Sequence, residues 1–285
     1  MNKKIIYDIG LHLGFDTKMY LQKGYKVIAI EANIDLVKSA EKTFLKEILL
    51  GDLKIVNCAI SDIDNQKIQF YICDVNSGSS LNEEMAKRGG NTRVQEVKTS
   101  TLPSLFKNYG VPYYCKIDIE GYDHIAIKTL INHSELLPKY ISAEINNLSD
   151  NGIISDLVQD ENELFELWTS SLDTLKKLGY KKFKLVDQVS LEVWDKNSSY
   201  LNSKLYFKNN IITKLTNKFL RVKTCLKTFF TINIGYPSDC SGPFGDELAN
   251  KWLEYNEAKE SILHHVKKGL KFKKRRMWCD IHASL

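Results

Sequence analysis

The sequence has few of the features that are typical of secreted proteins, membrane-spanning proteins or proteins with a structural zinc site. Its six cysteines are scattered over 285 residues with no C-x-x-C pair, which argues against a structural zinc site or a redox pair and favours reduced, mostly buried thiols. No uncharged apolar run approaches the roughly 18 residues of a membrane-spanning helix. Asp8 interrupts the first apolar run after three residues, unlike the core of a signal peptide. We therefore expect a soluble, cytoplasmic protein without a membrane span.

Linker sequences and a strong charge of one sign are also missing. Only five prolines occur, and no stretch rich in proline, glycine or serine divides the chain. Residues 1–150 carry 18 basic and 19 acidic side chains, and residues 151–285 carry 22 and 16. Such a mild excess does not by itself predict a nucleic-acid-binding protein. Two interpretations of the basic half remain open: a surface that attracts an anionic acceptor, and an ordinary solvated surface.

Short apolar runs alternate with helical patterns over the first two-thirds of the chain, which is typical of a parallel α/β sheet. The predicted strands are 4–9, 25–30, 53–60, 113–119, 140–145 and 182–187, with an extra pair at 67–73 and 94–99 and a closing strand at 277–283 that forms a hairpin with 182–187. The predicted helices are 15–23, 34–48, 123–131, 161–178 and about 246–268. We expect a core over 1–187, an insertion over 188–245 that is a candidate lid over the acceptor site, and a final helix and core strand over 246–285.

A glycine-bracketed turn joins the first strand to the first helix. Asp8 ends the strand, Gly10 and Gly14 bracket the turn, and Glu31 ends the next strand, where a carboxylate can accept both ribose hydroxyls of an adenosine-containing cofactor. The central glycine of a dinucleotide-binding G-x-G-x-x-G turn is missing, and Asp8 and Asp16 would repel a pyrophosphate. The turn therefore favours a cationic ligand, such as the ammonium and sulfonium groups of S-adenosylmethionine. An ordinary strand–helix turn is the alternative.

Other residues near strand ends are candidates for the same site. We expect a side chain at Gly10 to enter the slot for the methionine part of the cofactor and to abolish binding while the fold persists. His12, inside the turn, is placed to touch that end of the cofactor. Ser61 and Asp62 follow the third strand and are candidates for holding the adenine amino group, with a surface turn as the alternative.

A later strand ends in several charged residues. Strand alternation places Lys116, Asp118 and Glu120 on one side of it. Burying such groups without a function is costly, which favours a site. A structural cluster of ion pairs at the top of the sheet is the alternative.

Together these motifs resemble the FkbM family of S-adenosylmethionine-dependent methyltransferases. The resemblance rests on Asp8-x-Gly10, Glu31 and the segments 59–62 and 116–121, and it covers about residues 5–145. It implies a class I methyltransferase (Rossmann-like) fold, with a seven-stranded, mostly parallel sheet and an antiparallel last strand. It also implies O-methylation of a hydroxyl on a sugar, a glycan or a secondary metabolite. The cofactor-binding residues that we predict are Asp8, Gly10, His12, Gly14, Thr17, Glu31, Ser61, Asp62 and Asp118.

Methylation of a hydroxyl group requires the removal of its proton by a positioned base. Asp118, Glu120 and Glu144 are the predicted catalytic residues. Alternatively, Asp118 binds a divalent ion such as Mg²⁺ together with Glu144 and Asn146, and the ion lowers the pKa of the alcohol. Beyond this alternative, no metal site is predicted.

Two other classes of function remain open. The missing central glycine disfavours an NAD(P)-dependent oxidoreductase. A nucleic-acid methyltransferase or binding protein has the support of seven basic residues in Lys267–Arg276, but no interleaving of aromatic and basic residues marks a base-stacking platform. We expect the partner to be a small-molecule or glycan acceptor, with an anionic group if the basic half attracts it.

Overall fold

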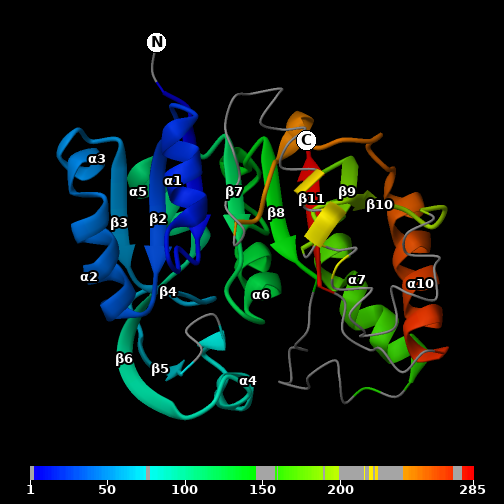
Figure 1. Cartoon of the computed structure of the whole chain (residues 1–285), viewed down its shortest axis with the longest axis horizontal. Coiled ribbons are helices and arrows are strands. Elements are labelled where there is room, and N and C mark those ends of the chain that lie inside the picture. The colour runs from blue at the N-terminus through cyan, green and yellow to red at the C-terminus, as the bar shows by residue number, and fades with distance from the viewer. Residues whose placement is uncertain are drawn as a thin grey trace. The chain divides into compact units, whose positions relative to one another are not determined.

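The structure, a computed structural model, describes residues 3–74, 78–145, 158, 160–188, 190–198, 215, 218–220, 222–223, 240–271 and 278–285 (Figure 1). The chain divides into two compact units, Met1–Ile141 and Ser142–Leu285. Most of the predicted insertion, as well as Asn146 and residues 272–277, lies outside the described residues. Within the described ranges, no helix is both long and apolar enough to cross a membrane.

The first unit contains a parallel sheet whose strands follow the order β3-β2-β1-β7. Its strands are β1 (Ile5–Ile9), β2 (Lys26–Glu31), β3 (Leu53–Asn57) and β7 (Tyr114–Ile117), and the boundary between the units falls within β8 (Tyr140–Glu144). Almost all side chains of β1, β2 and β7 are buried, as their apolar runs predict. Parallel pairing brings the carboxyl ends of these strands to one edge of the sheet, where the predicted site residues stand.

The helices of the first unit are α1 (Phe15–Gln22), α2 (Ile34–Thr43), α3 (Leu45–Leu49), α4 (Glu83–Lys87), α5 (Leu102–Tyr109) and α6 (Asp123–Lys128), with a 3-10 turn at Ser134–Leu136. Asn33 caps α2, because its Oδ1 accepts a hydrogen bond from the Asp35 amide. The single helix predicted over 34–48 is two helices. Phe44 interrupts it with φ −108° and ψ 25° and buries its ring against Gly14.

A separate three-stranded sheet belongs to the same unit and consists of β4 (Ala59–Ile60), β5 (Lys67–Cys73) and β6 (Thr92–Ser100), in the order β4-β6-β5. It lies beyond the arrowheads of β2 and β3 (Figure 1). The predicted antiparallel pair 67–73 and 94–99 is confirmed. The strand predicted over 53–60 is confirmed only over Leu53–Asn57. The chain then leaves the large sheet, and β4 pairs with β6, with Ala59 packed in one cluster with Phe70 and Val97.

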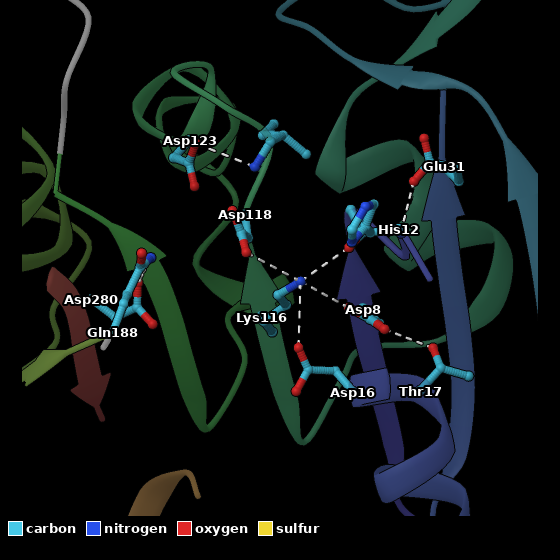
Figure 2. Close-up of polar contacts among 12 residues, drawn as sticks. Asp8, His12, Asp16, Thr17, Glu31, Lys116, Asp118, Asp123, Gln188 and Asp280 are labelled. Atoms are coloured by element: carbon cyan, nitrogen blue, oxygen red, sulfur yellow. Dashed lines mark hydrogen bonds and ion pairs between the residues drawn. The ribbon is translucent and has the colours of Figure 1, made fainter. Parts of the chain in front are cut away.

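The second unit contains β9 (Lys182–Asp187), β10 (Val193–Trp194), β11 (Cys279–Ser284), α7 (Glu161–Lys177), α10 (Tyr255–Lys271) and a 3-10 turn at Gly245–Glu247. β11 pairs antiparallel with β9, so the predicted hairpin is confirmed. Directly after β9, Gln188 Nε2 donates a hydrogen bond to Asp280 Oδ1, on β11, at 2.8 Å (Figure 2). The helix predicted from about residue 246 begins at Tyr255 instead, because Leu253 makes both backbone hydrogen bonds of a β-bridge with Phe183.

The chain has the predicted Rossmann-like α/β fold, with a mostly parallel sheet and an antiparallel last strand. Among the described residues, the larger sheet contains eight strands where the sequence predicts seven. The additional strand, β10, is two residues long and pairs with β9. Two residues are too few for an alternating pattern to be recognised in the sequence.

Candidate functional site

A buried ammonium group is surrounded by three carboxylates where β1 and β7 end and α1 begins (Figure 2). Lys116 Nζ lies 3.2 Å from Asp8 Oδ1, 3.6 Å from Asp118 Oδ2 and 3.8 Å from Asp16 Oδ2. It also donates a hydrogen bond to the Gly10 carbonyl at 3.0 Å. We call Lys116, Asp8, Asp16 and Asp118 the Lys116 cluster. Its geometry confirms that Lys116 and Asp118 share one side of their strand.

The Lys116 cluster is negatively charged overall, since three carboxylates surround one ammonium group and leave a formal excess of two negative charges. Burial lowers the pKa of Lys116, but Asp8, Asp118 and Asp16 together outweigh it, and the pKa lies well above its usual range. Lys116 is therefore charged at neutral pH. The side chains of Lys116 and Asp8 are almost fully buried, whereas that of Asp118 is 37% exposed. Asp118 is thus the member of the cluster that a ligand reaches most easily.

Asp8 and Thr17, two predicted cofactor-binding residues, are engaged with each other. Thr17 Oγ1 donates to Asp8 Oδ2 at 2.6 Å, and both side chains are inaccessible to solvent. Because the second oxygen of Asp8 faces Lys116, the observed role of this aspartate is to hold the ammonium group in place. Direct contact of Asp8 or Thr17 with a cofactor stays a prediction.

The glycine turn between β1 and α1 is fixed by backbone hydrogen bonds to the end of β2. The amides of Gly10 and Leu11 both donate to the Ile30 carbonyl, at 3.0 and 2.9 Å. Gly10 has φ +89°, and a β-carbon there would lie 2.0 Å from the carbonyl oxygen of Asp118. The expectation that a side chain at Gly10 enters a ligand slot and spares the fold is therefore wrong. The new β-carbon would meet the backbone carbonyl of Asp118, directly after β7. Gly14, at φ +78°, precedes α1 and packs on Phe44.

Glu31 receives a backbone amide on each carboxylate oxygen. His12 N donates to Oε2 at 2.9 Å, and Asn33 N donates to Oε1 at 2.8 Å. Burial raises the pKa of Glu31, against the opposing effects of these two amides and of Lys116. A carboxylate has about four acceptor positions, so Glu31 retains acceptor capacity for two ribose hydroxyls. The His12 backbone thus helps to orient Glu31, while the expected contact of His12 with the methionine end of the cofactor stays a prediction.

Ser61 and Asp62 follow β4, on the smaller sheet. The Ser61 amide donates to the Ser100 carbonyl at 3.1 Å, and Ser61 Oγ donates to Asp62 Oδ1 at 3.0 Å. Burial and the Asp62 carboxylate raise the pKa of Tyr122, the residue after the Glu120–Gly121 turn. Their predicted contact with adenine stays a prediction.

The sequence does not single out Asp64, which anchors this loop to the start of α5. Its oxygens accept hydrogen bonds from the Thr101 amide at 2.7 Å and from Ser104 Oγ at 2.6 Å. These bonds outweigh burial and lower the pKa of Asp64. The spacing of residues in the sequence does not predict that Asp64 anchors the loop, because its partners stand about 40 residues away along the chain.

The remaining predicted catalytic residues are placed differently. Glu120 has φ +50°, and its carbonyl accepts a hydrogen bond from Ser80 Oγ at 3.0 Å. Glu144 is buried at the end of β8, in the second unit, and Asn146 lies outside the described residues. Across the described part of the chain, no three or more His, Cys, Asp or Glu residues are arranged to hold a metal ion. The alternative of a shared magnesium site is therefore without structural support and stays a hypothesis.

Comparison with known proteins identifies one family. A model of the methyltransferase FkbM domain matches residues 8–181, from the end of β1 to the start of β9. No curated protein matches the sequence.

Three solved structures show weak similarity. The precorrin-6y C5,15-methyltransferase of Geobacter metallireducens GS-15 is 11% identical, with 66% of this chain and 69% of that chain covered and a TM-score of 0.32. The MccD protein is 11% identical, with 99% and 89% covered and a TM-score of 0.34. Coclaurine N-methyltransferase is 10% identical, with 99% and 65% covered and a TM-score of 0.34. TM-scores of this size assign neither an activity nor a substrate to this chain.

Proposed function

The chain belongs to the methyltransferase FkbM domain family, and from this premise we propose that it transfers the methyl group of S-adenosylmethionine to a hydroxyl oxygen of a sugar, a glycan or a secondary metabolite. The observation that carries the proposal is the negative charge of the Lys116 cluster beside the glycine turn. When bound, S-adenosylmethionine supplies a methyl group on a cationic sulfur that is a good leaving group. The chain itself must hold that cation, align the acceptor oxygen and take up its proton.

The charge of the site fits a cation better than an anion. The Lys116 cluster has an excess of two negative charges, and Glu31 adds a carboxylate at the end of the neighbouring strand β2. A sulfonium and an ammonium group would find favourable electrostatics here, with Asp118 the most exposed carboxylate of the cluster. A pyrophosphate would be repelled by the same carboxylates. The proposal therefore favours S-adenosylmethionine over a nicotinamide dinucleotide.

Replacing Glu31 with alanine is expected to weaken the affinity for S-adenosylmethionine by about 1.5–3 kcal/mol, the range for a hydrogen bond to a charged group. Because burial raises the pKa of Glu31, a growing share of Glu31 is protonated as the pH falls through this raised pKa. A protonated carboxyl accepts ribose hydroxyls less well, so wild-type affinity should fall with it. The affinity of Glu31→Ala for S-adenosylmethionine should not show this fall at low pH. Titration calorimetry at several pH values measures both effects.

Glu41→Ala is a matched control for Glu31, since Glu41 is an exposed glutamate of α2. It should leave the affinity and its pH dependence unchanged. Equal affinities of Glu31→Ala and wild type would exclude ribose binding by Glu31. Binding of NADH without binding of S-adenosylmethionine would overturn the proposed cofactor altogether.

Asp118 is the candidate that we favour as the base that removes the acceptor proton. Asp118→Asn is expected to lower kcat by about 10²-fold or more, because a positioned base contributes at least this much. An amide in place of the carboxylate keeps the size of the side chain but cannot accept the proton. Turnover with a methyl-labelled cofactor measures the effect. Asp52→Asn is the control, since the Asp52 side chain is 28% exposed and pairs with Lys3 instead of Lys116. Full activity of Asp118→Asn, Glu120→Gln and Glu144→Gln would exclude all three as the base.

A chelator separates direct carboxylate catalysis from assistance by Mg²⁺. Asp118, the carboxylate common to both accounts, already has a cationic partner in Lys116 Nζ, which lies 3.6 Å from its Oδ2, and this favours the direct carboxylate. Chelation should therefore leave wild-type turnover unchanged. A loss of activity that Mg²⁺ restores would establish the metal-assisted alternative instead.

The acceptor and the compartment are further parts of the proposal. The basic excess of residues 151–285 supports an acceptor with an anionic group, such as a nucleotide sugar or a phosphorylated glycan. The described cysteines 58, 73, 115, 240 and 279 are buried and form no disulfide with one another, which supports a reducing, cytoplasmic environment. The function is tested by incubating the protein with methyl-labelled cofactor and a panel of sugars, nucleotide sugars and lipid-linked glycans. Transfer to DNA or RNA, with steep salt dependence, would support the nucleic-acid alternative instead.

A further inference from the structure

The turn that follows Glu31 is held by side chains from two other strands. Gln95, on β6 of the smaller sheet, donates from Nε2 to the Ala32 carbonyl at 2.9 Å and accepts at Oε1 from the Ile34 amide at 3.2 Å. On the other strand, β3, Asn57 Nδ2 donates to the carbonyls of Glu31 and Ala32 at 2.8 and 3.0 Å. The turn therefore has few ways to move without breaking a hydrogen bond.

The two peptide groups that Gln95 binds lie on either side of Asn33. The Asn33 amide is one of the two donors that orient the Glu31 carboxylate, at 2.8 Å from Oε1. We propose that Gln95 is a positioning residue for the cofactor site: by bridging Ala32 and Ile34, it sets the direction of the Asn33 amide and hence the orientation of Glu31. The inference rests on the proposed function, because it assigns Glu31 to the ribose of the cofactor.

The chemistry of the side chain supports this role. A primary amide carries both a donor and an acceptor on one rigid group, so it can satisfy a carbonyl and an amide two residues apart at the same time. A leucine or methionine of similar size would fill the space and satisfy neither. The strand of Gln95 also reaches α2 through an exposed ion pair between Arg93 and Asp35. The smaller sheet thus holds the turn after Glu31 in place through β6. In Figure 1 this sheet lies beyond the end of β2.

The first test is amide hydrogen exchange in the ligand-free protein. Gln95→Met should speed the exchange of the Asn33 amide, since the turn on either side of it is no longer held. Gln69→Met is the matched control, because Gln69 lies on the same sheet, is exposed, and accepts at its side-chain oxygen a hydrogen bond from the Tyr71 hydroxyl. It should leave the exchange of Asn33 unchanged. Equal exchange of Asn33 in Gln95→Met and wild type would overturn the proposal, and Gln95→Asn, which is too short to bridge both groups, provides a second variant.

The second test is a double-mutant cycle with S-adenosylhomocysteine as the ligand. Gln95→Met should weaken its binding about 5- to 20-fold in the wild-type background, the effect of losing one or two net hydrogen bonds. In the Glu31→Ala background it should change binding less than about twofold, because Gln95 acts through Glu31. Equal losses in both backgrounds would overturn the proposal. If wild type does not bind the ligand, the proposed function fails, while the exchange of Asn33 still tests whether Gln95 positions the turn.

Discussion

Lys116→Met is expected to lower the free energy of unfolding by about 3–5 kcal/mol, the cost of leaving buried charges without their partner. The substitution keeps the length of the side chain but removes the ammonium group that lies 3.2 Å from Asp8 Oδ1 and 3.8 Å from Asp16 Oδ2. It also leaves the Gly10 carbonyl without the hydrogen bond from Nζ. Chemical denaturation of the variant and the wild type, at the same pH, measures the difference.

Lys3→Met is the matched control for this prediction. Lys3 pairs with Asp52 at 2.6 Å, but its side chain is 48% exposed, and exposed ion pairs contribute only about 0–1 kcal/mol. The double variant Asp8→Asn with Lys116→Met should recover part of the lost stability, because one buried charge is then neutral. Equal stabilities of Lys116→Met and Lys3→Met would contradict the assignment of a buried, charged ammonium.

The pH dependence of stability follows from the same ammonium group. Its pKa in the folded protein is raised above that of an unfolded lysine, because the three carboxylates outweigh the effect of burial. The stabilisation is therefore complete below the unfolded pKa of about 10.4 and is lost as the pH rises through the folded pKa. Lys116→Met should lack this alkaline loss.

The sequence predicts the large parallel sheet well because its strands are buried on both faces. The apolar runs of β1, β2 and β7 have clear ends, and each is followed by a charged residue or a turn. The β9–β11 hairpin is also predictable, although its strands stand almost 100 residues apart, since apolar and polar residues alternate along most of both strands. The alternating apolar residues are Phe183 and Leu185 in β9 and Cys279, Ile281 and Ala283 in β11. These elements depend on local patterns, which a sequence shows directly.

Elements that depend on a distant partner are not predictable in this way. The run 53–60 looks like one strand, yet it divides after Asn57 because Ala59 and Ile60 pair with β6, about 40 residues further along the chain. The start of α10 moves to Tyr255 because Leu253 pairs with Phe183. In both cases a backbone hydrogen bond to a remote strand overrides the local pattern.

The candidate site shows the same division. Strand alternation predicts that Lys116 and Asp118 lie together, and they do. It does not predict that Asp8 turns toward Lys116 and Thr17, or that Gln95 bridges the turn after Glu31. Spacing along the chain identifies which residues reach the edge of the sheet, and only the packed structure shows which of them satisfy one another and which remain accessible to a ligand.

Gly10→Ala is expected to lower the free energy of unfolding by about 2–5 kcal/mol, through two separate effects. A non-glycine residue at φ +89° occupies a backbone region that L-residues avoid. In addition, the new β-carbon would lie 2.0 Å from the Asp118 carbonyl oxygen, so the ends of β1 and β7 must separate. Because Asp118 belongs to the Lys116 cluster, this movement also weakens cofactor binding. Thermal or chemical denaturation measures the loss of stability, and calorimetry measures the affinity.

Gly24→Ala separates the two effects of the Gly10 substitution. Gly24 has φ +81°, close to that of Gly10, but a β-carbon there would meet nothing within 4 Å. It should therefore show only the backbone cost, about 1–2 kcal/mol, with cofactor affinity unchanged. The excess loss in Gly10→Ala then measures the clash with the strand end that carries Asp118. If the two variants are equally stable and only Gly10→Ala fails to bind the cofactor, the turn acts by opening a ligand slot, and the backbone clash derived from the structure is not what makes glycine necessary at this position.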